Sequence, residues 1–195
     1  MFVEPLYKSG DPARQSGWIE VICGSMFSGK TEELIRRLNR ARIARLDVRI
    51  FKPAVDTRYH HSYIVSHNDN SISSVPVNVA SEIAVLGGDC DVVGIDEAQF
   101  FDVQIVNVCN SLARKGKRVI VAGLDMDFKG EPFGYIPHLL ATAEYITKVH
   151  AICMVCGDVA SYSFRLSPVD DQVMLGETST YEARCRRCFN EGVAM

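Results

Sequence analysis

Short, continuous apolar runs recur along most of the chain, and helical patterns lie between them. Each run ends at a glycine, a proline or an acidic residue, which is typical of a buried strand rather than of a helix. The clearest runs predict strands at Trp18–Cys23, Val48–Phe51, Val92–Ile95 and Arg118–Gly123. Val75–Val79 alternates, and Pro76 within it indicates a strand at the edge of a sheet.

The strongest helical pattern directly follows Gly29. Leu34, Leu38 and Ala41 form its inward stripe, with Ile35 beside them. The same spacing predicts this helix to lie against a sheet with its polar side outward.

The outer side of this predicted helix is charged. Glu32 and Glu33 occupy its first turn, which suits the helix dipole, and i,i+4 pairs with Arg36 and Arg37 are expected. We interpret the basic run 36–45 as a solvated, acid-paired helix face rather than as a nucleic-acid-binding patch.

The remaining elements follow the same rules. Helices are expected at 103–115 and 137–143, and a short helix capped by Ser81-Glu82 is expected to run to Gly87. A last strand of this region is expected at 145–152. The span 54–74 is polar and rich in breakers, so we interpret it as a long loop.

Strands that alternate with helices predict an α/β fold with a parallel sheet and helices on both faces. Ligands bind such sheets at the carboxyl ends of the strands. Gly24, Asp96 and Asp125 each follow a predicted strand, so we expect them to converge on one edge.

The pattern changes after Cys153 to short strands separated by turns, near 161–166, 172–175 and 181–184. We place a domain boundary near Ala151. The expected organisation is a flexible N-terminal arm at 1–16, a nucleotide-binding domain at 17–151 and a small zinc-binding β domain at 152–195.

Composition narrows the class of protein. The chain has 195 residues, enough for one good-sized core or for one domain with a small appendage. Of these residues 47% are hydrophobic and 23% charged, which is ordinary for a soluble globular protein. The net charge of −3 disfavours a general nucleic-acid binder. We find no apolar run of signal-peptide or membrane-spanning length, and we expect a cytoplasmic protein that contacts no membrane.

Gly24–Thr31, GSMFSGKT, is a complete phosphate-binding-loop pattern, G-x-x-x-x-G-K-T. Gly24 and Gly29 allow backbone N–H groups to point together at a phosphate. Lys30 can reach the terminal phosphates of a nucleotide, and the Thr31 hydroxyl can bind Mg²⁺. The pattern predicts a nucleotide site.

Asp96 and Glu97 end another predicted strand. Beside a phosphate loop, Asp96 is expected to hold Mg²⁺ directly or through water. Glu97 is a candidate general base for an attacking hydroxyl or water. Position alone leaves both acceptors open, an alcohol in a kinase and water in an ATPase.

Two C-x-x-C pairs lie in the small β segment. Their residues are Cys153, Cys156, Cys185 and Cys188, and this spacing predicts a closed tetrahedral Zn²⁺ site of structural type. Reduced thiols or a redox pair are the alternative to zinc. A zinc ribbon that reads nucleic acid is a further alternative, although the surrounding segment is acidic.

The other cysteines and the phenylalanines are less specific signals. Cys23, Cys90 and Cys109 lie in apolar or strand-end contexts and are expected in the core. Phenylalanines 100, 101, 128 and 133 could line a flat slot for a planar base or be ordinary core aromatics.

Together these motifs resemble those of the cytosolic, zinc-containing thymidine kinases. The matching segments are GSMFSGKT, DTRY at 56–59, DEAQFF at 96–101, GLDMDFKGEPFG at 123–134, CMVC and CRRC. The resemblance extends from about Trp18 to Cys188. It implies a RecA-like P-loop NTPase fold and transfer of the γ-phosphoryl group of ATP to the 5′-hydroxyl of thymidine or deoxyuridine, a step of nucleotide salvage.

The resemblance also implies roles for single residues. Lys30, Arg58 and Glu97 would be catalytic, with Glu97 as the base, while Thr31 and Asp96 would hold Mg²⁺. The implied ATP site consists of Gly24, Ser25, Met26, Phe27, Ser28, Gly29, Lys30, Thr31, Asp56, Thr57, Arg58, Asp96, Glu97, Ala98 and Gln99.

For the nucleoside, the resemblance implies side-chain walls and a lasso-like loop that grips the base with backbone groups. The implied contacts are Met26, Phe100, Leu124, Phe128, Phe133, Ser163, Gln172, Val173, Met174, Leu175, Gly176 and Tyr181. Gln172 and Met174 stand where aliphatic residues are expected in the family. Cys188 stands where some relatives have a histidine, and both residue types bind zinc.

The resemblance further implies feedback inhibition by dTTP and a homotetramer, with no nucleic-acid partner. A P-loop ATPase or GTPase switch and a zinc-ribbon adaptor remain as alternatives. An N-K-x-D guanine-reading motif is absent from the sequence, and a switch protein has no use for the phenylalanine-rich loop.

Overall fold

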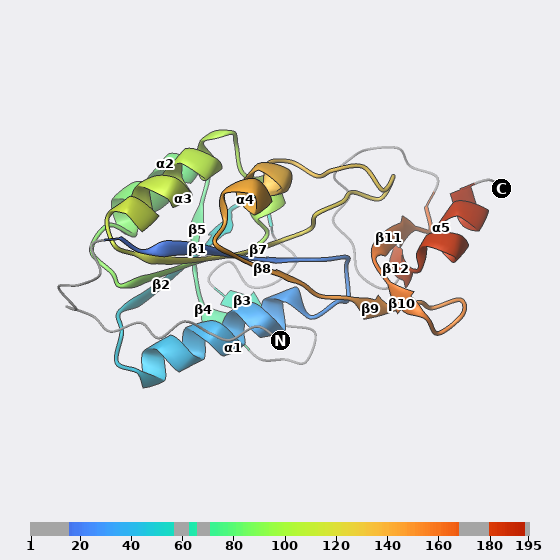
Figure 1. Cartoon of the computed structure of the whole chain (residues 1–195), viewed down its shortest axis with the longest axis horizontal. Helices are drawn as coiled ribbons and strands as arrows, with labels where there is room; N and C mark the ends of the chain where they lie inside the picture. Colours follow the sequence, from blue (N-terminus) through green and yellow to red (C-terminus); the bar gives the residue numbers. More distant parts are fainter. Residues whose placement is uncertain (1–15, 57–62, 66–70, 168–179, 194–195) are drawn as a thin grey trace.

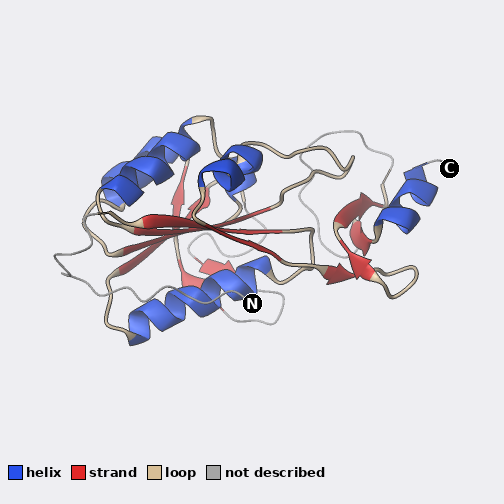
Figure 2. Ribbon diagram, in the orientation of Figure 1, coloured by secondary structure: helices blue, strands red, loops and turns tan. Residues whose placement is uncertain are grey.

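The computed structural model describes residues 16–56, 63–65, 71–167 and 180–193. Within these ranges, a six-stranded sheet forms the centre of the molecule (Figures 1 and 2). Its strand order is β5-β2-β6-β7-β1-β8, and every neighbouring pair is parallel. The strands are β1 Trp18–Cys23, β2 Val48–Pro53, β5 Val75–Val77, β6 Val92–Ile95, β7 Arg118–Gly123 and β8 Tyr145–Lys148.

Helices cover both faces of the sheet, as the alternating pattern predicts (Figure 1). The helix α1 (Lys30–Ile43) lies on one face, and α2 (Ala80–Leu86), α3 (Gln104–Arg114) and α4 (Ile136–Thr142) lie on the other. A short 3₁₀ helix, η1 (Ala98–Phe100), follows β6.

The two faces have separate hydrophobic cores. Leu34, Leu38, Ala41 and Ile35 of α1 are all buried, which confirms the predicted inward stripe. Cys23, Cys90 and Cys109 are buried as expected. Burial raises the pKa of Cys109 to about 12, so this thiol is a neutral core group.

The predicted helices and most of the predicted strands occur close to their expected bounds, and Val75–Val77 lies at the edge of the sheet. The predicted strand 172–175 lies outside the described residues. The short helix differs, because it begins at Ala80 rather than at a Ser81 cap. The Glu82 carboxylate reaches back to the backbone N–H of Val79, at 3.3 Å. The Ala80 N–H is bound by the side chain of Asp102, at 3.0 Å.

The span 54–74 is not structureless. It contains an antiparallel pair, β3 (Tyr63–Val65) and β4 (Ser71–Ser73). Ile72 is buried in the core on the α1 side of the sheet. One buried apolar residue is too short a pattern from which to predict a strand.

The chain after β8 forms a separate group of elements beyond one end of the sheet (Figure 1). The predicted strand 145–152 is divided, because its last residues pair with a different ladder. The elements are β9 (Ala151–Ile152) with β10 (Val159–Ala160), β11 (Tyr162–Arg165) with β12 (Tyr181–Arg184), and an additional helix α5 (Arg186–Val193).

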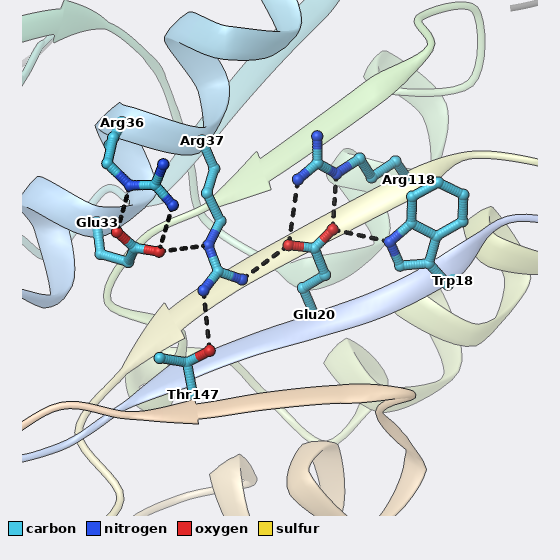
Figure 3. A network of polar contacts seen from close by, with 7 residues as sticks. All are labelled: Trp18, Glu20, Glu33, Arg36, Arg37, Arg118 and Thr147. Atoms are coloured by element: carbon cyan, nitrogen blue, oxygen red, sulfur yellow. Dashed lines mark hydrogen bonds and ion pairs between the residues drawn. The ribbon is translucent and has the colours of Figure 1, made fainter. Parts of the chain in front are cut away.

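Arg37 departs from its predicted place on a solvated face. Its side chain is 0% exposed and donates to Glu20 of β1 (2.8 Å), while Glu33 accepts a second bond (2.8 Å) as the i,i+4 pattern predicts (Figure 3). Arg118 of β7 bonds Glu20 from its other side, at 2.7 Å. This buried network fixes α1 to the strands beneath it.

Candidate active site

The phosphate loop joins β1 to α1 at the carboxyl end of the sheet. Gly24 has φ +146°, and a side chain there would come within 2.1 Å of the Val149 carbonyl oxygen. Gly29, with φ +84°, precedes the first residue of α1, and no side chain of the described residues caps that helix end. The positive end of the helix dipole and its backbone N–H groups are therefore directed at the loop.

Lys30 is folded across the loop. Its Nζ donates to the Ser25 carbonyl oxygen at 2.7 Å, and the Ser28 hydroxyl donates to the same atom at 2.7 Å. The side chain is held beside the backbone that forms the cradle, where an ammonium group can bind phosphate oxygens.

Asp96 meets the phosphate loop at the end of β6, as predicted. The Thr31 hydroxyl donates to its Oδ2 at 3.3 Å. Burial, and then the charge of Glu97, raise the pKa of Asp96 to about 7. A hydroxyl and two carboxyl groups gathered beside a phosphate cradle fit a hard divalent cation such as Mg²⁺.

Glu97 adopts a left-handed backbone conformation, with φ +51°. Its N–H donates to the Asp96 Oδ1 at 3.0 Å, and its side chain lines one cleft with Lys30, Thr31 and Leu124. A carboxylate in this cleft can accept a proton from a hydroxyl group placed next to a terminal phosphate.

Ala98 and Gln99, also expected at the ATP site, are buried within η1. The Gln99 amide donates to Glu97 Oε2 and accepts a bond from the Leu124 N–H at 3.0 Å. The sequence gives no signal for this bridge, because its partners come together only when β6 and β7 align.

The predicted nucleoside walls lie around the same end of the sheet. Phe100 and Phe133 pack edge to face, with ring centroids 5.8 Å apart. Phe128 is covered by the Arg165 guanidinium, 3.5 Å from its centroid, and Arg165 donates to the Tyr181 hydroxyl at 2.7 Å. Arg165 thus joins two predicted nucleoside contacts and was missed at the sequence level.

Ser163 lies against the phosphate loop. Its hydroxyl accepts a hydrogen bond from the Met26 N–H at 3.0 Å. Two residues expected at the nucleoside are therefore in direct contact, although they lie far apart in the sequence. Phe27 also packs against the core of the C-terminal group.

The four cysteines of the two pairs come together as predicted, with all Sγ atoms within 4.8 Å of one another. Zinc bound by four thiolates places the sulfur atoms about 3.8 Å apart, so the cluster fits this metal. Burial alone would raise the pKa of Cys153, but backbone N–H groups of Cys185, Cys156 and Val155 lower it to about 6. Amide donors of this kind stabilise a thiolate ligand.

Several predicted site residues lie outside the described ranges. They are Thr57, Arg58 and the segment 172–176. Asp56, at the end of the preceding range, is buried.

The chain is similar to known proteins that are described as thymidine kinases. A family model described as thymidine kinase matches residues 17–189, which include the phosphate loop and both cysteine pairs. The chain is 59% identical over 180 residues to the thymidine kinase of Bacteroides fragilis, with 92% of this chain and 90% of that protein covered. It is equally 59% identical to those of Bacteroides thetaiotaomicron over 176 residues (90% and 88%) and of Rhodothermus sp. over 173 residues (89% and 81%).

Proposed function

The chain belongs to the thymidine kinase family, and from this premise we propose that it transfers the γ-phosphoryl group of ATP to the 5′-hydroxyl of thymidine. The product is dTMP, and deoxyuridine is the second acceptor. One observation carries the proposal: Glu97 lines the same cleft as the phosphate loop and Leu124. This supports assigning Glu97 as a proton acceptor between the proposed site of the donor phosphate and the proposed site of the nucleoside.

In this proposal the loop from Gly24 to Thr31 binds the ATP phosphates with backbone N–H groups. Lys30 leaves the Ser25 carbonyl oxygen to bind the transferring group. Glu97 accepts the proton of the acceptor hydroxyl as the bond to phosphorus forms. Arg58, which follows Asp56 and Thr57 in the sequence, is assigned to stabilise the negative charge that develops on the transferring phosphoryl group.

Thr31 and Asp96 are the residues that would hold Mg²⁺, which neutralises charge on the phosphate oxygens when bound. Their contact at 3.3 Å supports this assignment. The residues of the chain do the positioning, because phosphoryl transfer needs little covalent help from a protein.

The thymine is assigned to a slot between the aromatic side chains and the loop 172–176. Phe100, Phe128 and Phe133 are its proposed walls, with Met26 and Leu124 toward the phosphates. The contacts of Ser163 with Met26 and of Tyr181 with Arg165 support placing the C-terminal segment beside the nucleoside.

The remaining assignments rest on the family. Zn²⁺ on the four cysteines would be structural, since a four-thiolate site leaves no open position. We also assign to this protein inhibition by dTTP, a homotetrameric state and a cytoplasmic location. Among the described residues, no helix is long and apolar enough to cross a membrane.

The test is release of ADP from ATP and Mg²⁺ against a panel of nucleosides. Thymidine and deoxyuridine should stimulate release, whereas hydrolysis that is independent of nucleoside would indicate an ATPase. Glu97→Gln should lower kcat about 10²-fold or more. Glu131→Gln is the matched control, because Glu131 is exposed and the charge change is the same. Turnover by Glu97→Gln at the wild-type rate would remove Glu97 from the role of base.

A further inference from the structure

The buried Gln99 side chain joins two residues that line the cleft, Glu97 and Leu124. It belongs to η1 directly after Glu97, and only 4% of the residue is exposed. One end of its amide contacts the Glu97 carboxylate, and the other contacts the backbone of Leu124. Both partners line the cleft that contains the phosphate loop.

The orientation of this amide follows from the chemistry of its partners. The backbone N–H of Leu124 can only donate, so the atom 3.0 Å from it must be the carbonyl oxygen Oε1 of Gln99. The amino group Nε2 then necessarily faces Glu97 and donates to its Oε2. An ionised carboxylate is an acceptor, so this bond holds it in one orientation.

Close packing keeps the bridge in place. A Cβ atom at Gly123 would lie 2.9 Å from Gln99 Oε1, and one at Gly134 would lie 2.4 Å from the Gln99 backbone oxygen. Gly134 also has φ +54°, which disfavours other residues. The fold therefore leaves space for this glutamine between two glycines.

Glu97 is constrained from both ends. Its backbone is left-handed, with the N–H bound to Asp96 Oδ1 at 3.0 Å, and its carboxylate is bound by Gln99. A carboxylate that must accept a proton at one moment of the reaction gains from a fixed orientation, because small displacements lower the rate steeply.

We propose that Gln99 is a positioning residue, which orients the Glu97 carboxylate toward the acceptor hydroxyl and ties it to the nucleoside side of the cleft at Leu124. This inference rests on the proposed function of Glu97 as base. It gives Gln99 a role distinct from contact with ATP.

Gln99→Glu removes the donor and adds a negative charge beside Glu97. The new carboxylate has the same shape and still accepts the Leu124 N–H, but its second oxygen faces Glu97 instead of an amino group. We expect kcat to fall about 10- to 100-fold while the Kd of ATP stays within twofold. Gln99→Met, which adds no charge, should lower kcat in the same direction. Asn110→Asp on α3 is the matched control: it also exchanges an amide donor, bonded to Val106 O at 2.9 Å, for a carboxylate.

A double-mutant cycle separates positioning from a structural role. In a Glu97→Gln background, Gln99→Met should cause no further loss of kcat, because the group it orients is already gone. If the loss of kcat in the double variant equals the product of the two single losses, the inference is overturned. It is also overturned if kcat is unchanged in both Gln99→Glu and Gln99→Met. A raised Kd of ATP at unchanged kcat would instead assign Gln99 to ATP.

The proposed function is checked separately with the wild-type protein. If the wild type does not phosphorylate thymidine, the function is wrong. If it does, and the Gln99 variants match it, only the positioning role fails.

Discussion

Two adjacent arginines should differ severalfold in their contribution to stability. Arg36→Met and Arg37→Met make the same chemical change one residue apart on α1. The Arg36 side chain is 49% exposed and pairs with Glu33. In Arg36→Met, Glu33 can still pair with Arg37. The Arg37 side chain is 0% exposed and bonds Glu20, Glu33 and Thr147 (Figure 3).

The magnitudes follow from burial. An exposed ion pair is worth roughly 0.2–1 kcal/mol. Removing one partner of a buried pair costs roughly 3–5 kcal/mol, because the other charge stays buried with fewer partners. For a urea m-value of about 3 kcal/mol/M, Arg37→Met should lower the midpoint of unfolding by roughly 1–2 M, and Arg36→Met by at most about 0.3 M.

The chain supplies its own probe for this measurement. Trp18 is the only tryptophan, and its indole N–H donates to Glu20 Oε1 at 2.7 Å. Its fluorescence should therefore report on the buried network, while far-UV circular dichroism reports on the helices. Coinciding transitions would justify a two-state free energy. The reasoning is refuted if the two variants unfold within about 1 kcal/mol of each other, a difference that exposed pairs alone can produce.

Three further results are expected. Arg165→Met should raise the thymidine KM about tenfold and leave the ATP KM unchanged, because Phe128 and Tyr181 lose a shared charged partner; an equal change in both KM values would contradict this. Removal of zinc, verified by metal analysis, should raise the thymidine KM by loosening the segment that carries the nucleoside contacts, and an unchanged KM would count against a structural metal. A hydrogen bond from Arg36 lowers the pKa of Glu33, and Arg37 lowers it further against the opposing effect of burial. The stability difference between wild type and Arg36→Met should thus be present at neutral pH and vanish as the pH falls through that lowered pKa, whereas a pH-independent difference would point to packing.

The parallel sheet was predictable because buried parallel strands are apolar on both faces. Runs such as Val92–Ile95 therefore stand out from their surroundings, and the stripe of α1 has the helical period. The divided strand after Tyr145 and the hairpin within 54–74 were not predictable, since each depends on a partner strand rather than on a local pattern. Helix α5 was also missed, because its polar sequence starts within a cysteine pair.

The phosphate loop, the acidic pair and the four cysteines were predictable because their chemistry requires fixed residue types at fixed spacing. The phosphate loop and the acidic pair converge because parallel strands end at one edge, whereas the four cysteines come together in the C-terminal group of short antiparallel strands. Gln99 and Arg165 differ, since each acts through a contact between segments that are distant in the sequence. Glutamine and arginine are common residue types, so only the contacts in the folded structure distinguish these two from the other glutamines and arginines of the chain.

Glu20 and Arg118 show a signal that sequence reasoning could have used. Each is a lone charged residue in or beside an apolar run that predicts a buried strand, and both are within 3% of complete burial. A charge in such a place must be paired, because an unpaired one would cost too much free energy. Two predicted central strands that carry opposite charges at their amino ends should therefore be neighbours. Here β1 and β7 are indeed adjacent, and the Arg118 guanidinium bonds both oxygens of Glu20, at 2.7 and 3.2 Å. Applied to the sequence, this rule allows β1 to lie beside β7, although β2, β5 and β6 lie between them in the sequence. In the structure, Arg37 of the covering helix bonds Glu20 as well.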